Sequence, residues 1–72
     1  MIEHTAHIDA LGRIRLPNKD QVTGLWVVKY FKNDKWNEEK FQDISESWSF
    51  YYRMFNILKS EFLEQLKQRN SK

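Results

Sequence analysis

The chain is short, lacks cysteine and carries little net charge, and each of these properties excludes a class of protein. It has 72 residues, with 12 Lys and Arg against 10 Asp and Glu. The lack of Cys excludes disulfides and thiolate metal sites, and it fits a reducing compartment. No apolar run approaches the ~20 residues of a membrane span, and residues 1–4 lack the basic start and apolar stretch of a signal peptide. We therefore expect one cytoplasmic domain spanning residues 1–72, with no membrane partner.

Aromatic residues are the main source of buriable surface. A chain of this size buries only about 60% of the surface that it exposes when unfolded. It contains three Trp, three Tyr and five Phe, and each large ring can bury ~150–250 Å². A core is therefore possible, and a second copy of the chain would reinforce it.

Residues 1–35 are expected to be rich in β-structure and to begin with a hairpin. Apolar and polar residues alternate over residues 2–8, as in a half-buried strand. Gly12 supplies a turn after this segment, because it can take a positive φ. Residues 13–16 alternate again and stop at Pro17, which cannot donate a hydrogen bond to a sheet.

The strongest β segment follows at residues 25–31, centred on Trp26. It is rich in β-branched and aromatic residues, as strands prefer. Both parities are apolar up to Val28, so we expect this strand to be central or covered on both faces. Together with the N-terminal hairpin, it predicts a small antiparallel sheet of three to four strands.

Residues 36–41 fit two structures. They can form a return strand across a tight turn at residues 33–34, which are typical turn residues. Alternatively, Asn37 can cap a helix that begins there. A second cap signature, Asp43 followed by Glu46, places the start of the helix just after Asp43, and we favour this later start.

A long helix is predicted over residues 43–69. This segment contains no Gly or Pro and is rich in good helix formers. At about 100° per residue, one broad apolar face gathers the residues expected to face the core. They are Ile44, Trp48, Tyr51, Tyr52, Phe55, Leu58, Phe62, Leu63 and Leu66. The predicted fold is an α+β domain in which the sheet packs on this helix.

A second apolar stripe, formed by Phe50, Met54 and Ile57, lies roughly opposite the line from Trp48 to Leu66. Some 26 helical residues span about 39 Å, whereas a compact chain of this length has a diameter of roughly 29 Å. We therefore expect the stripe to contact another chain, either in a homodimer or in a complex with another protein. The alternative is that it lies under the N-terminal hairpin of the same chain. The expected protein interface consists of Phe50, Arg53, Met54, Ile57 and Glu61.

No catalytic or cofactor motif is found. The chain has no H-E-x-x-H, no Gly-rich phosphate loop and no nucleophile elbow. His4 and His7 would lie on opposite faces of a strand, so we do not expect them to share a metal ion. We expect no enzyme activity, no cofactor, no metal and no small-molecule substrate.

Nucleic acid is a further candidate partner, although a net charge of +2 permits it without favouring it. The candidate contacts are Arg13, Arg15, Lys19, Lys29 and Lys32.

Two stretches resemble DNA-binding families. Residues 8–17, Ile-Asp-Ala-Leu-Gly-Arg-Ile-Arg-Leu-Pro, resemble the V-D-x-x-G-R-I-x-L-P stretch of the AbrB/MraZ swapped-hairpin family. Residues 24–47 combine a Gly-x-Trp strand, a tight turn, a strand ending in Phe and an acid-capped helix, and resemble AP2-like and integrase arm-binding domains. The second resemblance implies a three-stranded sheet that enters a DNA groove and a helix that backs the sheet. It also implies that Phe41 lies in the core and that four residues lie near the DNA: Arg13, Arg15, Lys29 and Lys40.

The leading functional hypothesis is a small non-enzymatic binding or regulatory module, of the kind carried by mobile elements, that self-associates through its long helix. DNA binding through a basic sheet face is one branch of this hypothesis. The alternative is a protein-only adaptor, inhibitor or structural subunit that docks a target on the aromatic helix.

Overall fold

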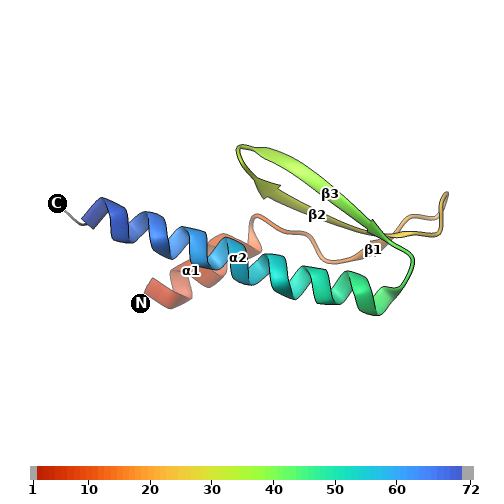
Figure 1. Ribbon diagram of the computed structural model, residues 1–72, viewed down its shortest axis with the longest axis horizontal. Coiled ribbons are helices and arrows are strands. Elements are labelled where there is room, and N and C mark those ends of the chain that lie inside the picture. Colours follow the sequence, from red (N-terminus) through yellow and green to blue (C-terminus); the bar gives the residue numbers. More distant parts are fainter. Residues whose placement is uncertain (1, 71–72) are drawn as a thin grey trace.

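The computed structural model has two layers, an antiparallel sheet above a pair of helices (Figure 1). The structure describes residues 2–70, with side chains for residues 4–67. In chain order the elements are α1 (Ile2–Leu11), β1 (Asn18–Lys19), β2 (Trp26–Lys32), β3 (Lys35–Phe41) and α2 (Ile44–Asn70). The strand order is β1-β2-β3. The predicted α+β fold, a small antiparallel sheet with one long C-terminal helix, is confirmed.

A tight turn at Asn33 and Asp34 joins β2 to β3. Both residues have a positive φ, of 57° and 65°, as in a two-residue type I′ hairpin loop. The side-chain amide of Asn37 donates to the carbonyl oxygens of Lys32 at 3.2 Å and Lys35 at 3.1 Å, which ties the turn to β3. The return strand, one of the two predicted alternatives, is therefore the structure formed, and the helix capped by Asn37 is wrong.

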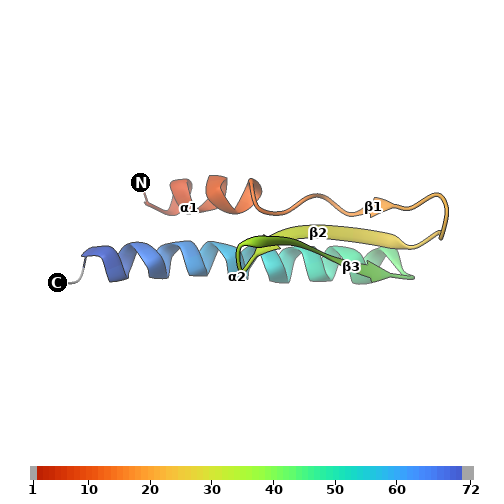
Figure 2. The ribbon, with the colours of Figure 1, turned by 90° about the horizontal axis from the view of Figure 1, so that it is seen from above.

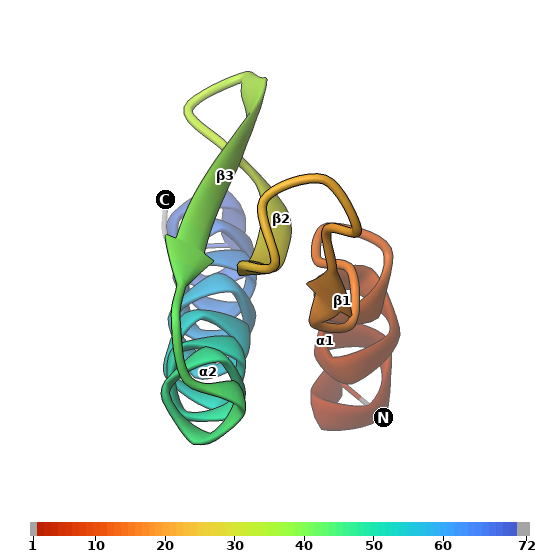
Figure 3. The same ribbon diagram turned by 90° about the vertical axis from the view of Figure 1, so that its right-hand side faces the viewer.

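Residues 2–11 correct the sequence analysis, because they form helix α1 and not the first strand of a hairpin. Ala6 and Ala10, one helical turn apart, are fully buried. α1 runs antiparallel to α2 beside it in the lower layer (Figures 2 and 3). The alternating pattern was misleading because residues four apart share a face in a helix as well as in a strand.

The chain between α1 and β1 lies along the edge of β2. Ile14 forms an isolated bridge with Tyr30, and further on Asn18 lies opposite Val27. Between these two pairs the segment has one residue more than the stretch of β2 opposite it, and this extra residue forms a β-bulge. The bulge includes Pro17, which has no N–H to donate. Residues 13–16, predicted to form the second strand of an N-terminal hairpin, therefore lie beside β2. The prediction of that hairpin is wrong.

Helix α2 begins at Ile44, the later of the two predicted starts. The carboxylate of Asp43 caps it by accepting a hydrogen bond from the N–H of Ser45 at 3.3 Å. Glu46 adds an acidic side chain in the first turn, where the helix dipole favours it. The prediction of one long C-terminal helix is confirmed as far as Asn70. No helix within the described residues is both long and apolar enough to cross a membrane.

The core is small and lies where α1, α2 and β2 meet. It consists of Ala10, Ile14, Val28, Tyr51 and Leu58. The molecule is long and thin, with extents of 50 × 21 × 14 Å and a radius of gyration of 14.0 Å, against about 11 Å for a compact chain of this length. Its accessible surface is 5609 Å², whereas a compact monomer of the same mass exposes about 4,800 Å². The chain therefore hides less of its surface than a compact domain does.

We expect Asp34→Gly to raise the free energy of unfolding by about 1 kcal/mol, because Gly takes a positive φ without steric cost. A gain of this size raises Tm by about 4–8 °C in a domain of this size, which thermal unfolding followed by circular dichroism measures.

The matched control for this substitution is Gly24→Ala. Gly24 has a φ of 76°, and a Cβ atom there would meet no other atom within 4 Å. Only backbone strain therefore acts, and stability should fall by about 1 kcal/mol. A lower Tm for Asp34→Gly would show that the left-handed turn carries no cost at this position.

Candidate interaction surfaces

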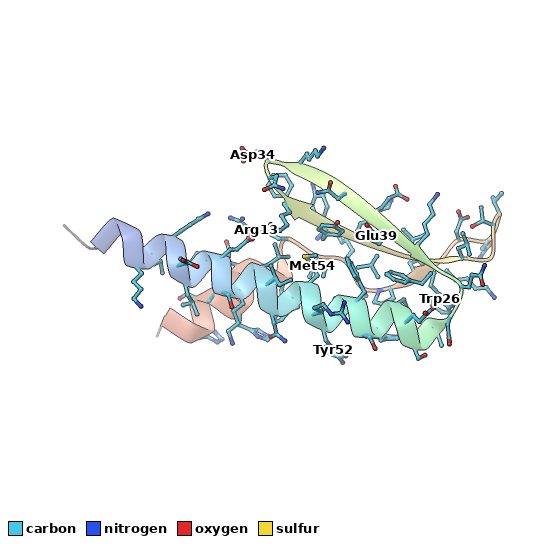
Figure 4. The ribbon with its side chains drawn as sticks, in the orientation of Figure 1. Arg13, Trp26, Asp34, Glu39, Tyr52 and Met54 are labelled. Atoms are coloured by element: carbon cyan, nitrogen blue, oxygen red, sulfur yellow. The ribbon has the colours of Figure 1, made fainter. Side chains whose placement is uncertain are left out.

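The sheet covers the side of α2 that carries Phe50 and Met54. The ring of Phe50 lies 5.5 Å from that of Tyr30 and 5.3 Å from that of Phe41, measured between centroids. Met54 packs against the core, and its side chain points from α2 toward the sheet in Figure 4. Two members of the predicted docking stripe therefore pack within their own chain, under β2 and β3.

The remaining three residues of the predicted interface differ in their surroundings. Glu61 forms an ion pair with Lys32, with 2.8 Å between Oε2 and Nζ. Arg53 is exposed, and Ile57 is 37% exposed. Contact between this stripe and a second chain stays a prediction, and Arg53 and Ile57 are the members that solvent reaches most freely.

The rotation of α2 differs from the one expected. Among the described side chains of α2, the buried ones are those of Ser47, Tyr51 and Leu58, at 0%, 7% and 2% exposure. Tyr51 and Leu58 belong to the predicted core face, and for them the prediction is right. The flank of that face carrying Trp48 and Tyr52 turns away from the sheet, because the sheet packs on the side of Phe50 instead.

Helix α1 covers part of this second flank. The ring of His7 meets that of Phe55 edge to face, with 5.0 Å between centroids. Because the two helices run antiparallel, the end of α1 at Leu11 lies level with a position on α2 that precedes Phe55. The N-terminal half of this flank of α2 therefore has no helix beside it (Figure 2).

An aromatic cluster extends along this flank of α2, and its members Trp48 and Phe55 also pack against the core. The ring centroid of Trp48 lies 5.4 Å from that of Tyr51 and 5.8 Å from that of Tyr52. Tyr51 in turn stacks on Phe55 at 6.2 Å. Tyr52 is 59% exposed and points away from the sheet in Figure 4.

Two exposed aliphatic side chains adjoin this cluster. Ile44 is 45% exposed and precedes Trp48 by one helical turn, and Leu11, at the end of α1, is 44% exposed. Leu11 follows His7 by one turn and so lies on the side of α1 that carries His7. We call the following set the helical patch: Leu11, Ile44, Trp48, Tyr52 and Phe55.

Two of the five candidate nucleic-acid contacts are engaged in ion pairs. Nε of Arg13 lies 3.1 Å from Oδ2 of Asp9, one turn earlier in the chain. Lys32 pairs with Glu61 on the side of the sheet that faces α2. Each ion pair uses part of the hydrogen-bonding capacity of its cation and offsets part of the charge that a phosphate would meet.

The other three candidates are exposed. The guanidinium of Arg15 lies over the ring of Trp36, 4.7 Å from its centroid. Lys29 projects from β2 on the face of the sheet that is turned away from α2, and Lys19 lies in β1. Trp36 was not among the predicted contacts, because the sequence leaves open whether residues 36–41 form a strand or a helix.

The two histidines lie on α1, three residues apart, and therefore share one side of a helix. The expectation that they occupy opposite faces of a strand is wrong. Among the described residues, no group of three or more His, Asp or Glu side chains is placed to hold a metal ion.

Comparisons of the chain with protein-family models, with curated proteins and with solved structures find no match. Residues 8–17, which resemble the swapped-hairpin family, form the end of α1, a turn and the segment beside β2, so the implied hairpin is not formed. The order of strand, tight turn, strand and helix that the second resemblance implies is present in β2, β3 and α2.

We expect Met54→Glu to lower the free energy of unfolding by about 3 kcal/mol or more, because it places a charge between α2 and the sheet. Ile57→Glu, three residues further on, should cost less than about 1 kcal/mol, since Ile57 is 37% exposed. Urea unfolding of the two variants measures the difference. Equal losses would contradict the rotation of α2 described above.

Burial raises the pKa of Tyr51, and the neighbouring Tyr52 raises it further. The unfolded chain therefore loses this proton first, so the stability that Tyr51 contributes is complete below pH 10 and is lost as the pH rises above it. We expect the difference in unfolding free energy between the wild type and Tyr51→Phe to shrink as the pH rises from about 9 to about 11. A difference that stays constant over this range, in urea unfolding at each pH, would contradict the burial of the phenol.

Proposed function

We propose that this chain is a small non-enzymatic binding module that self-associates through the helical patch. The observation that carries the proposal is Tyr52, a large ring that is 59% exposed, packs on Trp48 and points away from the sheet. Contiguous exposed apolar surface marks interaction sites, and aromatic residues are enriched at the centres of interfaces.

A second copy of the chain is the occupant that the shape favours. The chain has a small core and an accessible surface larger than that of a compact monomer. A twofold axis across the patch would pack two α2 helices against each other and bury both patches in one contact. Small domains without disulfides often gain stability by assembling in this way.

The same patch would also serve an adaptor or inhibitor that docks a different protein. Anchors such as Trp48 and Tyr52 suit either partner, because large aromatic rings dominate binding energy in both kinds of interface. The oligomeric state of the purified chain separates the two functions.

We expect the wild type to sediment at about twice its monomer mass of 8.8 kDa at high micromolar concentration. Tyr52→Glu should sediment as a monomer, because it would place a charge at the centre of the buried contact. Loss of a central aromatic anchor typically costs about 2 kcal/mol or more, which is about 30-fold or more in the dissociation constant. Sedimentation equilibrium measures both masses, and far-UV circular dichroism reports whether the variant is folded.

Ser60→Glu is the matched control, because Ser60 is exposed on the same helix, outside the patch. It adds the same charge and should leave the association unchanged. A monomeric wild type at several hundred micromolar excludes self-association. Equal weakening by the two variants would show that the contact lies elsewhere on α2.

A further inference from the structure

The sheet has a second face, turned away from both helices, whose composition differs from that of the helical patch. Side chains alternate along β2 and β3, so the face opposite Val28 and Tyr30 carries the intervening residues. Lys29 lies opposite Glu38, and Phe31 lies opposite Trp36. We call the following set the outer sheet face: Arg15, Val27, Lys29, Phe31, Trp36, Glu38 and Lys40.

Trp36 is the exposed aromatic residue of this face. It is 48% exposed, although its ring is held by two neighbours. Phe31 meets it edge to face at 5.6 Å between centroids, and the guanidinium of Arg15 lies 4.7 Å from its centre. A large ring fixed in place and open to solvent can stack a flat ligand without losing much side-chain freedom.

A shallow pocket of about 600 Å³ adjoins this ring, with Arg15 between the two. Its lining includes Asn18, Lys19, Val27, Lys29 and Glu38. The pocket is therefore lined by three cations, Arg15, Lys19 and Lys29, together with two apolar side chains and two carboxylates.

Positive charge exceeds negative charge on this side of the molecule. Arg15, Lys29 and Lys40 are exposed here, and within the described residues none of the three has a carboxylate at ion-pair distance. The second carboxylate beside the pocket, that of Asp20, accepts a hydrogen bond from the N–H of Val22 at 2.9 Å, and this bond together with the charge of Lys40 lowers its pKa.

We propose that the outer sheet face binds single-stranded nucleic acid, with a base stacked on Trp36 and the phosphates on Arg15, Lys29 and Lys40. Exposed aromatic rings set among cations are the combination that single strands require, because each unpaired base offers a flat face and each linkage a negative charge. A duplex keeps its bases stacked on one another, so it cannot use Trp36 in this way. Trp36 and Lys40 lie about 13 Å apart along β3, so that the face accommodates a short stretch of strand. This surface is distinct from the helical patch, and the inference does not depend on self-association.

The test is fluorescence anisotropy of a fluorescein-labelled oligothymidylate of about 16 nucleotides, titrated with the full chain. Trp36→Ala should weaken binding by about 5- to 150-fold, the range found when one stacking ring is removed. Tyr52→Ala removes a comparably exposed ring from the helical patch and should leave the affinity within about twofold. If Trp36→Ala proves unfolded by circular dichroism, Trp36→Phe replaces it and should weaken binding by a smaller factor.

Salt dependence tests the phosphate contacts separately. Three contacts to a single strand predict an affinity loss of about 20-fold between about 50 mM and about 200 mM KCl. Lys29→Gln should reduce the slope of log affinity against log salt by about 0.7. Lys67→Gln, at an exposed position on α2, removes the same charge and should leave the slope unchanged.

Four outcomes would overturn the proposal. The first is no change in anisotropy up to about 100 μM protein at about 50 mM KCl, and the second is unchanged affinity in the folded Trp36 variant. The third is tighter binding of a hairpin duplex than of the single strand. The fourth is that polyglutamate competes for the protein as well as an unlabelled single strand does. Tighter binding of the duplex would indicate that the face binds in the groove of a duplex. Equal competition by polyglutamate would indicate a general polyanion site. Because the monomeric Tyr52→Glu chain can be titrated in the same assay, failure of one surface is distinguishable from failure of the other.

Discussion

The packing of Phe50 against Tyr30 and Phe41 is the contact on which the other surfaces of the molecule depend. It fixes the rotation of α2 about its axis, because the sheet can meet only one flank of the helix. Once Phe50 and Met54 are under the sheet, the line of Trp48 and Tyr52 must point away from it. The same contact orients the hairpin, so that Phe31 and Trp36 face solvent. One cluster of rings therefore determines both candidate interaction surfaces.

Helix α1 and the bulged segment after it complete a core that α2 and the hairpin would leave open. Ala6 and Ala10 have no exposed surface, and Ile14 fills the space beside Val28 and Leu58. Small residues on α1 allow a close approach to α2, at the cost of adding little apolar area. The result is an arrangement with few fully buried side chains, in which Tyr52 of α2 stays 59% exposed.

The elements whose local signals agree could be predicted, and those decided by tertiary packing could not. No Gly or Pro interrupts α2 and Asp43 caps it, while the β-branched run of β2 and the turn at Asn33 and Asp34 are local features. The helical structure of residues 2–11 could not be predicted, because their apolar spacing fits a strand and a helix equally. Burial against α2 decides between the two. The side of α2 that packs on the sheet is also not determined by the sequence of the helix alone. A helix that is apolar around most of its circumference does not specify which stripe meets the sheet. Trp36 was missed for a related reason, since its exposure depends on the register of β3 with β2.

The helical patch and the outer sheet face lie on opposite layers of a molecule whose thinnest dimension is 14 Å. A dimer formed through the helical patches would therefore present its two outer sheet faces in opposite directions. A short strand could then occupy one face at a time, and its affinity would be that of a single face. A strand long enough to pass around the dimer could occupy both, and the second contact would form at a high effective concentration. Self-association and nucleic-acid binding would thus be independent for short ligands and coupled for long ones, because the coupling arises from geometry and requires no change in either surface.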